Sequence, residues 1–308
     1  MTTALITHLA CLRHEPPPGH PERPARLQSI LAALEADEFR SLLRREAPEA
    51  SLDALARVHD RDYAEEVLAA IPSKGIAHLD ADTAVSPGSR DAILRAAGAV
   101  VEAVDMVMRG EAQNAFCAVR PPGHHALPDR AMGFCLFNNV AVGAAHARTV
   151  HGLNRVAVID FDVHHGNGTE AMFFADPDLF YGSTHQWPFY PGTGRPGETR
   201  PDHIVDLPLP AGTGGAEFRR AFAETLLPAL NRFRPEMVFI SAGFDAHQDD
   251  PLGQMRLVED DYSWATEVLC EVAARHSSGR VVSTLEGGYD LGALARSVRA
   301  HVQALMAA

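Results

Sequence analysis

The chain has 308 residues, of which 46% are hydrophobic and 22% are charged, a balance typical of a globular protein with a large buried core. Its formal net charge of −13 argues against direct nucleic-acid binding, because neutralising a phosphate backbone requires clustered lysine and arginine. No apolar stretch is long enough to cross a bilayer and the amino terminus lacks a secretory pattern, so we expect a cytoplasmic protein without membrane contact.

The predicted helices and strands alternate along the chain. A helix is expected to begin near Pro24, and apolar residues recur at helical intervals in four further segments, 89–108, 139–149, 216–233 and 260–275. Continuous apolar runs predict strands over 115–119, 156–161, 237–240 and 281–285. Buried strands that alternate with helices indicate an α/β fold, with a mostly parallel central sheet and helices on both faces.

Each of these four strands ends in small or glycine-rich sequence that carries reactive side chains. Ligands bind outside the carboxyl ends of strands in such sheets, so we expect the four endings to form one site. The segments that follow the strands are Arg120-Pro121-Pro122-Gly123-His124-His125, Asp162-Val163-His164-His165-Gly166, Ser241-Ala242-Gly243-Phe244-Asp245 and Glu286-Gly287-Gly288-Tyr289.

The second of these strand ends suggests a metal site. Along an extended chain Asp160, Asp162 and His164 point to the same side, and carboxylates buried there need a cation. Asp162 and His164, together with Asp245 from the next strand end, supply one nitrogen and two oxygen ligands. Three protein ligands and an open fourth position are typical of catalytic zinc. An isolated Asp-x-His sequence would more often be a salt-bridged or capping pair.

The neighbouring strand ends offer groups for proton transfer. His124 and His125 are candidate acid–base residues, although a His-His pair in a loop is commonly without a chemical role. Tyr289 is either a loop aromatic or a donor to a developing oxyanion. The four cysteines, which form no C-x-x-C pair, are expected to be reduced and buried; they are Cys11, Cys117, Cys135 and Cys270.

Taken together, five motifs in order resemble the zinc-dependent histone deacetylase family, especially its class II branch and bacterial homologues. The resemblance runs from about His20 to Tyr289 and implies a single-domain arginase/deacetylase-type fold over residues 1–308. The motifs are Arg120-Pro121-Pro122-Gly123-His124-His125-Ala126, Gly133-Phe134-Cys135-Leu136-Phe137-Asn138-Asn139, Asp160-Phe161-Asp162-Val163-His164-His165-Gly166-Asn167-Gly168-Thr169, Ser241-Ala242-Gly243-Phe244-Asp245 and Glu286-Gly287-Gly288-Tyr289.

The resemblance implies hydrolysis of the amide of an acylated lysine, in a peptide or protein, or of a similar acylated amine. One zinc ion per chain would be held by the three ligands named above. His125 would act as general base and acid, and His124 as the electrostatic histidine beside it, supported by Asp160. Tyr289 would donate to the tetrahedral oxyanion. Asn167 stands behind His125, as in class II members, where class I relatives have aspartate.

The resemblance also implies residues that contact the substrate and a structural cation. Gly133 and Phe134 would line a tunnel for the amine stem, opposite Tyr190, which replaces the usual phenylalanine. Asp82 falls where relatives hold the substrate backbone, and Leu252 falls at the rim. A potassium ion is expected beside Asp160 and Ser183, with backbone carbonyls of Asp162, His164 and Thr184.

Three alternatives stay open at this point. Arginase-like manganese hydrolases need a second metal and further carboxylates, whereas this chain has Gly166 at the corresponding position. Acetylpolyamine amidohydrolases tend to carry a rim glutamate, and Leu252 favours peptide or protein substrates instead. A noncatalytic acyl-lysine-binding module is disfavoured, because all three ligands, both histidines and the tyrosine are present together.

Overall fold

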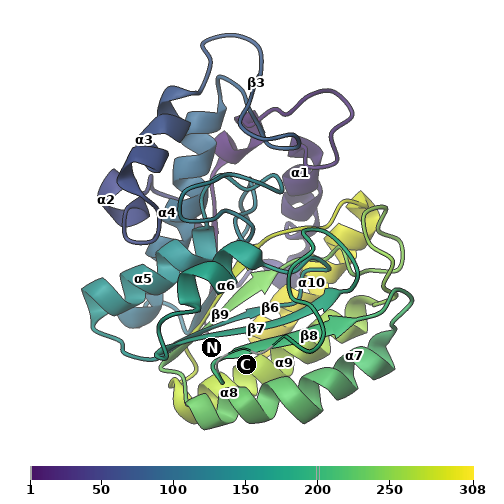
Figure 1. The fold of residues 1–308 in the computed structure, drawn as a ribbon. Coiled ribbons are helices and arrows are strands. Elements are labelled where there is room, and N and C mark those ends of the chain that lie inside the picture. Colours follow the sequence, from purple (N-terminus) through teal and green to yellow (C-terminus); the bar gives the residue numbers. More distant parts are fainter. Residues whose placement is uncertain (1, 199, 201) are drawn as a thin grey trace.

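A single large sheet forms the centre of the molecule (Figure 1). The computed structural model describes residues 2–198, 200 and 202–308. Within these residues, eight strands form the sheet: β1 (Thr3–Thr7), β2 (Leu43–Glu46), β5 (Asn114–Cys117), β6 (Val156–Asp160), β7 (Leu179–Gln186), β8 (Ile204–Leu209), β9 (Met237–Ala242) and β10 (Val281–Leu285). Their spatial order is β2-β1-β5-β10-β9-β6-β7-β8, and all neighbours run parallel.

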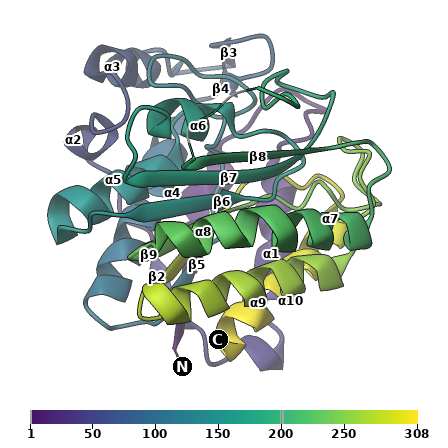
Figure 2. The same ribbon diagram turned by 60° about the horizontal axis from the view of Figure 1, so that its bottom comes forward.

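Helices cover both faces of this sheet, as predicted. On one face lie α4 (Ser89–Met108), α5 (Asn139–His151) and α6 (Asn167–Phe173). The opposite face is covered by α7 (Gly215–Ala221), α8 (Leu227–Phe233), α9 (Glu259–His276) and α10 (Leu291–Ala307), which Figure 2 brings forward. None of the helices in the described part of the chain is both long and apolar enough to cross a membrane.

Smaller elements lie outside these layers. The helix expected near Pro24 is α1 (Pro24–Ala33), which packs against α10. The short helices α2 (Leu52–Leu55) and α3 (Arg61–Ala69) precede an antiparallel pair of strands, β3 (Ala77–His78) and β4 (Ala84–Val85). The 3-10 helices Leu9–Arg13 and Asp37–Phe39 complete the amino-terminal third.

The predicted bounds agree closely with the structure, and the differences have local causes. The helix expected to end at Thr149 continues to His151, because the chain leaves the helix only at Gly152, whose φ of 70° is left-handed. The helix expected over 216–233 contains a π-helical segment, Phe222–Leu226. Two strands expected to reach residues 119 and 161 end at Cys117 and Asp160.

The core contains a fully buried histidine on α10. Nδ1 of His301 lies 2.6 Å from Thr266 Oγ1 and its Nε2 lies 2.8 Å from Ser283 Oγ, while the ring of Phe116 contacts it edge-on. Burial lowers the pKa of His301 to about 3. His301 is therefore neutral in the folded chain at any pH at which the protein would be studied.

Acidification should destabilise the fold through His301. An unfolded histidine has an ordinary pKa of about 6.5, so below that pH the unfolded chain takes up a proton that folded His301 does not. His301 makes its full contribution to the free energy of unfolding above about pH 6.5. This contribution should fall by about 2 kcal/mol by pH 5. Urea unfolding at pH 7.5 and pH 5 should show that the free energy of unfolding falls less in His301→Gln than in the wild type. An equal fall in both proteins would show that His301 is not the source of this pH dependence.

Candidate active site

The four strand ends singled out in the sequence lie side by side. Strands β5, β10, β9 and β6 are consecutive in the sheet and parallel, so their carboxyl ends meet at one edge. The segments that follow them are largely buried. The expected convergence of the four endings is therefore observed.

Asp162, His164 and Asp245 form the centre of this edge. His164 Nδ1 lies 2.9 Å from Asp162 Oδ1 and 3.2 Å from Asp245 Oδ2, and both carboxyl groups are fully buried. Burial alone would lower the pKa of His164, but the two carboxylates outweigh it and raise that pKa to about 10. The centre thus strongly favours a positive charge.

Backbone N–H groups hold the two carboxylates in place. Asp162 Oδ2 accepts a hydrogen bond from Gly287 N at 2.8 Å, and Asp245 Oδ1 accepts one from Val163 N at 2.8 Å. Asp245 Oδ2 is buried and accepts no hydrogen bond among the described residues; it meets only the edge of the His164 ring, at 3.2 Å from Nδ1. A buried carboxylate oxygen without a hydrogen bond is costly unless a cation lies beside it. The donor set of one nitrogen and two carboxylates fits a zinc ion with an open position.

The residues after β6 converge for a different reason from the one expected. The strand ends at Asp160, and residues 162–164 bend, so strand alternation does not orient them. Instead, Asp160 Oδ1 accepts the N–H of Asp162 at 3.1 Å, and Asp162 Oδ1 accepts the N–H of His164 at 2.9 Å. Each aspartate therefore caps the backbone two residues further on and turns the chain around the centre.

A glycine lets the backbone approach the carboxylates closely. A Cβ at Gly287 would lie 2.0 Å from Asp245 Oδ2 and 2.6 Å from Asp162 Oδ2. Any side chain there would occupy the space beside the centre. The Glu-Gly-Gly sequence before Tyr289 therefore reflects a steric requirement of the site.

The two adjacent histidines have opposite electrostatic environments. His124 Nδ1 lies 2.9 Å from Asp160 Oδ2. Burial lowers the pKa of His124, but Asp160 and Asp162 outweigh it and raise that pKa to about 10. Burial and the charges on His124 and His164 hold the pKa of His125 well below its ordinary value. His124 is therefore suited to carry a positive charge and His125 to accept a proton.

Asn167 determines which nitrogen of His125 is free to accept that proton. The amide of Asn167 donates through Nδ2 toward the carbonyl oxygen of His125 and toward Met132 Sδ, which places Oδ1 against the ring. Oδ1 lies 2.8 Å from His125 Nδ1, so Nδ1 carries the hydrogen and donates it. Nε2 then keeps its lone pair.

Glu286 fixes the loop that carries the two histidines, a role that the sequence did not indicate. Its Oε2 accepts hydrogen bonds from Gly123 N at 2.6 Å and from His124 N at 3.1 Å. Burial raises the pKa of Glu286 to about 7. The Glu-Gly-Gly-Tyr motif marks Glu286 as part of the site. Its role could not be read from the motif, because its hydrogen-bond partners lie more than 160 positions away in the sequence.

Tyr289 is held at the same edge by residues from distant segments. Its backbone N–H donates to Asp250 Oδ2 at 2.6 Å, and the Arg26 guanidinium lies 4.8 Å from the centre of its ring. Burial raises the pKa of Tyr289 well above its ordinary value, so the phenol keeps its proton. Asp250 and Arg26 were not recognised from the sequence, because nothing local marks their contact with Tyr289.

Two of the predicted tunnel residues lie beside the histidines. Gly133 has a φ of 59°, and a Cβ there would lie 2.4 Å from the ring of His125. The ring of Tyr190 stands perpendicular to that of His125, with 5.2 Å between centroids. Phe189, which was not singled out in the sequence, stacks on His164 with centroids 5.3 Å apart.

The other predicted substrate-binding residues are linked to the site through hydrogen bonds or ring contacts. Asp82 Oδ1 accepts the N–H of Gly133 at 3.1 Å, and the ring of Phe134 lies 6.0 Å from that of Tyr289. Leu252 is half-buried, and its N–H donates to Asp250, the same residue that holds Tyr289. Among the described residues, no ring contact or side-chain hydrogen bond links Leu252 to the tunnel residues Gly133, Phe134 and Tyr190.

Behind the histidine pair, Asp160 and Ser183 are register partners on β6 and β7. Ser183 Oγ lies 2.9 Å from His185 Nδ1. The neighbour of His164, His165, faces a different group, with Nδ1 2.7 Å from Thr193 Oγ1 and Nε2 2.6 Å from Glu170 Oε2. All four cysteines are free and buried, as predicted.

A parallel α/β sheet that holds a buried carboxylate–imidazole centre, a histidine pair and a tyrosine at its carboxyl edge is typical of a hydrolase with a metal-binding site. Residues 20–305 match the family model of the histone deacetylase domain. The chain belongs to the histone deacetylase family, which confirms the resemblance carried by the motifs.

Individual relatives agree with this assignment. The histone deacetylase-like amidohydrolase of Pseudomonas aeruginosa is 41% identical over 277 residues, which cover 88% of this chain and 73% of that protein. The human polyamine deacetylase HDAC10 is 38% identical over 326 residues, covering 99% of this chain and 48% of HDAC10. The crystal structure of the HDA15 HD domain has a TM-score of 0.93 at 34% identity, covering 99% of this chain and 88% of that one.

Proposed function

We propose that the chain, as a single catalytic domain over residues 1–308, hydrolyses the amide bond of acylated lysine side chains in peptides or proteins. The observation that carries this proposal is the buried centre of Asp162, His164 and Asp245, beside a histidine pair and a tyrosine. These three residues would hold one zinc ion. When bound, zinc would polarise the acyl carbonyl and lower the pKa of a water molecule toward about 7.

In this proposal, the residues around the centre have different roles in proton transfer and charge stabilisation. His125, neutral and with Nε2 free, takes the proton from the attacking water and returns it to the leaving amine. His124, paired with Asp160, supplies positive charge beside the negative charge that develops on the substrate. The phenol of Tyr289 donates a hydrogen bond to the tetrahedral oxyanion.

The rim residues position the substrate in this proposal. Gly133 and Phe134 on one side and Tyr190 on the other enclose the aliphatic stem of the amine, next to His125. Asp82, which already accepts the Gly133 N–H, keeps a second carboxylate oxygen for the substrate backbone. A potassium ion beside Asp160 and Ser183 is part of the same proposal, and it would offset the buried charge of Asp160.

A two-metal, arginase-like reaction is less compatible with the space around Gly166. A Cβ at this position would lie 2.3 Å from Asp160 Oδ2 and 2.6 Å from the Tyr181 hydroxyl. The position therefore cannot carry the additional carboxylate that a second metal ion needs unless its neighbours move.

The second candidate substrate is an acetylated polyamine, which the similarity to a polyamine deacetylase keeps open. Leu252 at the rim supports the peptide alternative, because an uncharged side chain offers no attraction to a polyamine cation. Parallel measurements of kcat/KM on acyl-lysine peptides of increasing acyl length and on acetylated polyamines should favour a peptide.

A matched variant makes this substrate experiment sharper. Leu252→Glu adds a carboxylate at the rim and should shift the ratio of kcat/KM toward polyamines, whereas Leu252→Gln, of the same size but uncharged, should leave it nearly unchanged. Preference of the wild type for polyamines would overturn the substrate proposal. Absence of turnover on every acylated amine would overturn the proposed reaction as well.

A further inference from the structure

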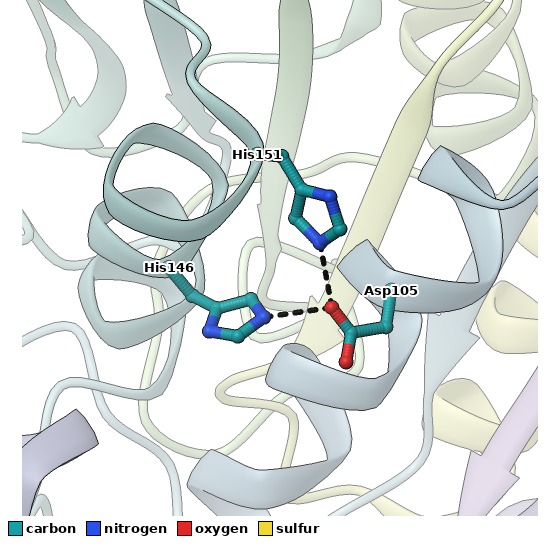
Figure 3. A group of neighbouring side chains, drawn as sticks. All are labelled: Asp105, His146 and His151. Carbon is teal, nitrogen blue, oxygen red and sulfur yellow. Dashed lines mark hydrogen bonds and ion pairs between the residues drawn. The ribbon is translucent and has the colours of Figure 1, made fainter.

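A second group of metal-ligating side chains lies between α4 and α5, apart from the active site (Figure 3). Asp105 is in the last turn of α4, and His146 and His151 are near the end of α5. Nε2 of His146 lies 2.7 Å from Asp105 Oδ1, and Nε2 of His151 lies 2.6 Å from the same oxygen. Both imidazoles are therefore directed at one carboxylate oxygen.

This group is remote from the catalytic residues. The first residue of α5, Asn139, is the one that packs against the loop of the histidine pair: a Cβ at Gly123 would lie 2.5 Å from Asn139 N. His151 is the last residue of α5, roughly 18 Å further along the helix axis. A ligand bound there would not touch the active site.

The charge of Asp105 suits metal coordination. Burial alone would raise the pKa of Asp105, but the hydrogen bonds and charges of His146 and His151 outweigh it and lower that pKa. Asp105 is therefore ionised at neutral pH. Arg109 Nη1 is 3.7 Å from the other oxygen, Oδ2, so Oδ1 is left to the two imidazoles.

A comparison with a similar cluster near the active site shows why this one is the better cation site. His165, Glu170 and Asp206 also converge, but Arg200 already lies among them, 3.0 Å from Glu170 and paired with Asp206. Its guanidinium supplies the positive charge that an ion would bring. Two guanidinium groups also lie beside the Asp105 cluster, but on its outer side: Arg109 is 3.7 Å from Asp105 Oδ2 and Arg57 is 2.9 Å from His146 Nδ1, so neither occupies the space at Oδ1.

We propose that Asp105, His146 and His151 form a second, noncatalytic binding site for a divalent transition-metal ion such as Zn²⁺. Their ligand atoms all lie within 4.8 Å of one another, and two imidazoles with one carboxylate are ligands that zinc accepts. The side chains of Asp105, His146 and His151 are 25%, 10% and 19% exposed, so water can complete the coordination. The ion would join α4 to α5.

Binding requires a small rearrangement. Tetrahedral coordination at about 2.0–2.1 Å separates neighbouring ligand atoms by roughly 3.3 Å. The two nitrogen–oxygen distances of 2.7 and 2.6 Å would therefore widen by about 0.6 Å. Rotation of partly exposed side chains at helix ends can provide this change without moving the helices.

Arg57 sets the affinity of the proposed site. Its Nη1 donates to His146 Nδ1 at 2.9 Å, and since arginine cannot accept, the hydrogen of His146 must be on Nε2. A metal at Nε2 needs that hydrogen on Nδ1, where it would face the guanidinium. Arg57 is exposed, so it can move aside, but its presence opposes binding.

Metal content after equilibrium dialysis against Zn²⁺ tests the site directly. The wild type should retain one ion per chain more than His151→Ala or Asp105→Asn, while Asp162→Asn, altered at the catalytic centre, should keep the ion at the second site. His151→Ala should retain its circular dichroism spectrum and deacylase activity, because the cluster does not touch the active site. A wild type and His151→Ala with equal zinc content would overturn the proposal.

Two arginine variants test the argument about the hydrogen on His146. Arg57→Glu offers an acceptor to Nδ1 and should tighten Zn²⁺ binding about tenfold, as partners of metal-bound histidines do. Arg40→Glu makes the same change of charge at an exposed arginine paired with Asp37, and it should leave the affinity unchanged. If both variants changed the Zn²⁺ affinity equally, the effect would come from net charge alone. Arg57 would then not control the position of the hydrogen on His146.

Discussion

Tyr289→Phe should lower kcat by about 10²–10³-fold, which is the usual cost of removing one donor to an oxyanion. The substitution removes only the phenolic oxygen. The ring keeps its contacts with Arg26 and Phe134, and the backbone N–H keeps its hydrogen bond to Asp250. KM and the content of catalytic metal should change little, because the hydroxyl acts on the transition state and is not a metal ligand.

An appropriate control is a second aromatic hydroxyl beside His125. Tyr190→Phe removes the hydroxyl from a ring that is 39% exposed and stands against His125, and it should leave kcat close to the wild-type value. Steady-state kinetics on one acyl-lysine peptide, with metal analysis of each variant, would make the comparison. An unchanged kcat in Tyr289→Phe would show that Tyr289 does not stabilise the oxyanion.

The central part of the fold and site was predictable because the chemistry lies directly after buried strands. The apolar run before Asp160 marks a strand, and parallel strands bring their carboxyl ends together, so Asp162, His164 and Asp245 were expected to meet. The register of individual strands was not predicted, and neither were the outer strands β1, β2, β7 and β8. The sequences of β7 and β8 mix apolar and polar residues without a clear period.

The supporting residues could not be found in the same way. Asp250 acts on Tyr289 through a backbone N–H 39 positions away, and Glu286 acts on His124 through a backbone N–H 162 positions away. Any residue type supplies a backbone N–H, so neither partner marks the pairing in the sequence. The second metal cluster was missed for a related reason: His146 and His151 are five positions apart, which does not place them on one face of a helix.

The largest effect is expected at the metal centre. Asp245→Asn keeps the size of the side chain but removes one of the two buried negative charges around His164. Zinc affinity at the catalytic site should fall by more than about 100-fold, because even residues that only support a ligand account for 10–100-fold. Turnover should fall in parallel, since the group that activates water would no longer be retained.

Stability provides a second measurement that does not depend on turnover. In the wild type, a chelator removes the ion and leaves two buried carboxylates with a single imidazole between them, so it should lower Tm. An ion present at about 1,000 times its Kd adds roughly 4 kcal/mol to the free energy of unfolding. Asp245→Asn should show little response to the chelator, because it lacks both the tight binding and part of the repulsion between the carboxylates.

Both measurements are best made in a His151→Ala background, which removes a ligand of the proposed second site from the zinc content. Asn167→Ala serves as the control: it removes a residue that contacts His125 but no metal ligand, so it should slow turnover while retaining the zinc and the response to the chelator. If Asp245→Asn retained one zinc per chain and the wild-type response of Tm to the chelator, then Asp245 would not be a ligand. Asp245 Oδ2, which accepts no hydrogen bond among the described residues, would then be balanced by the His164 imidazolium 3.2 Å away and by no metal ion.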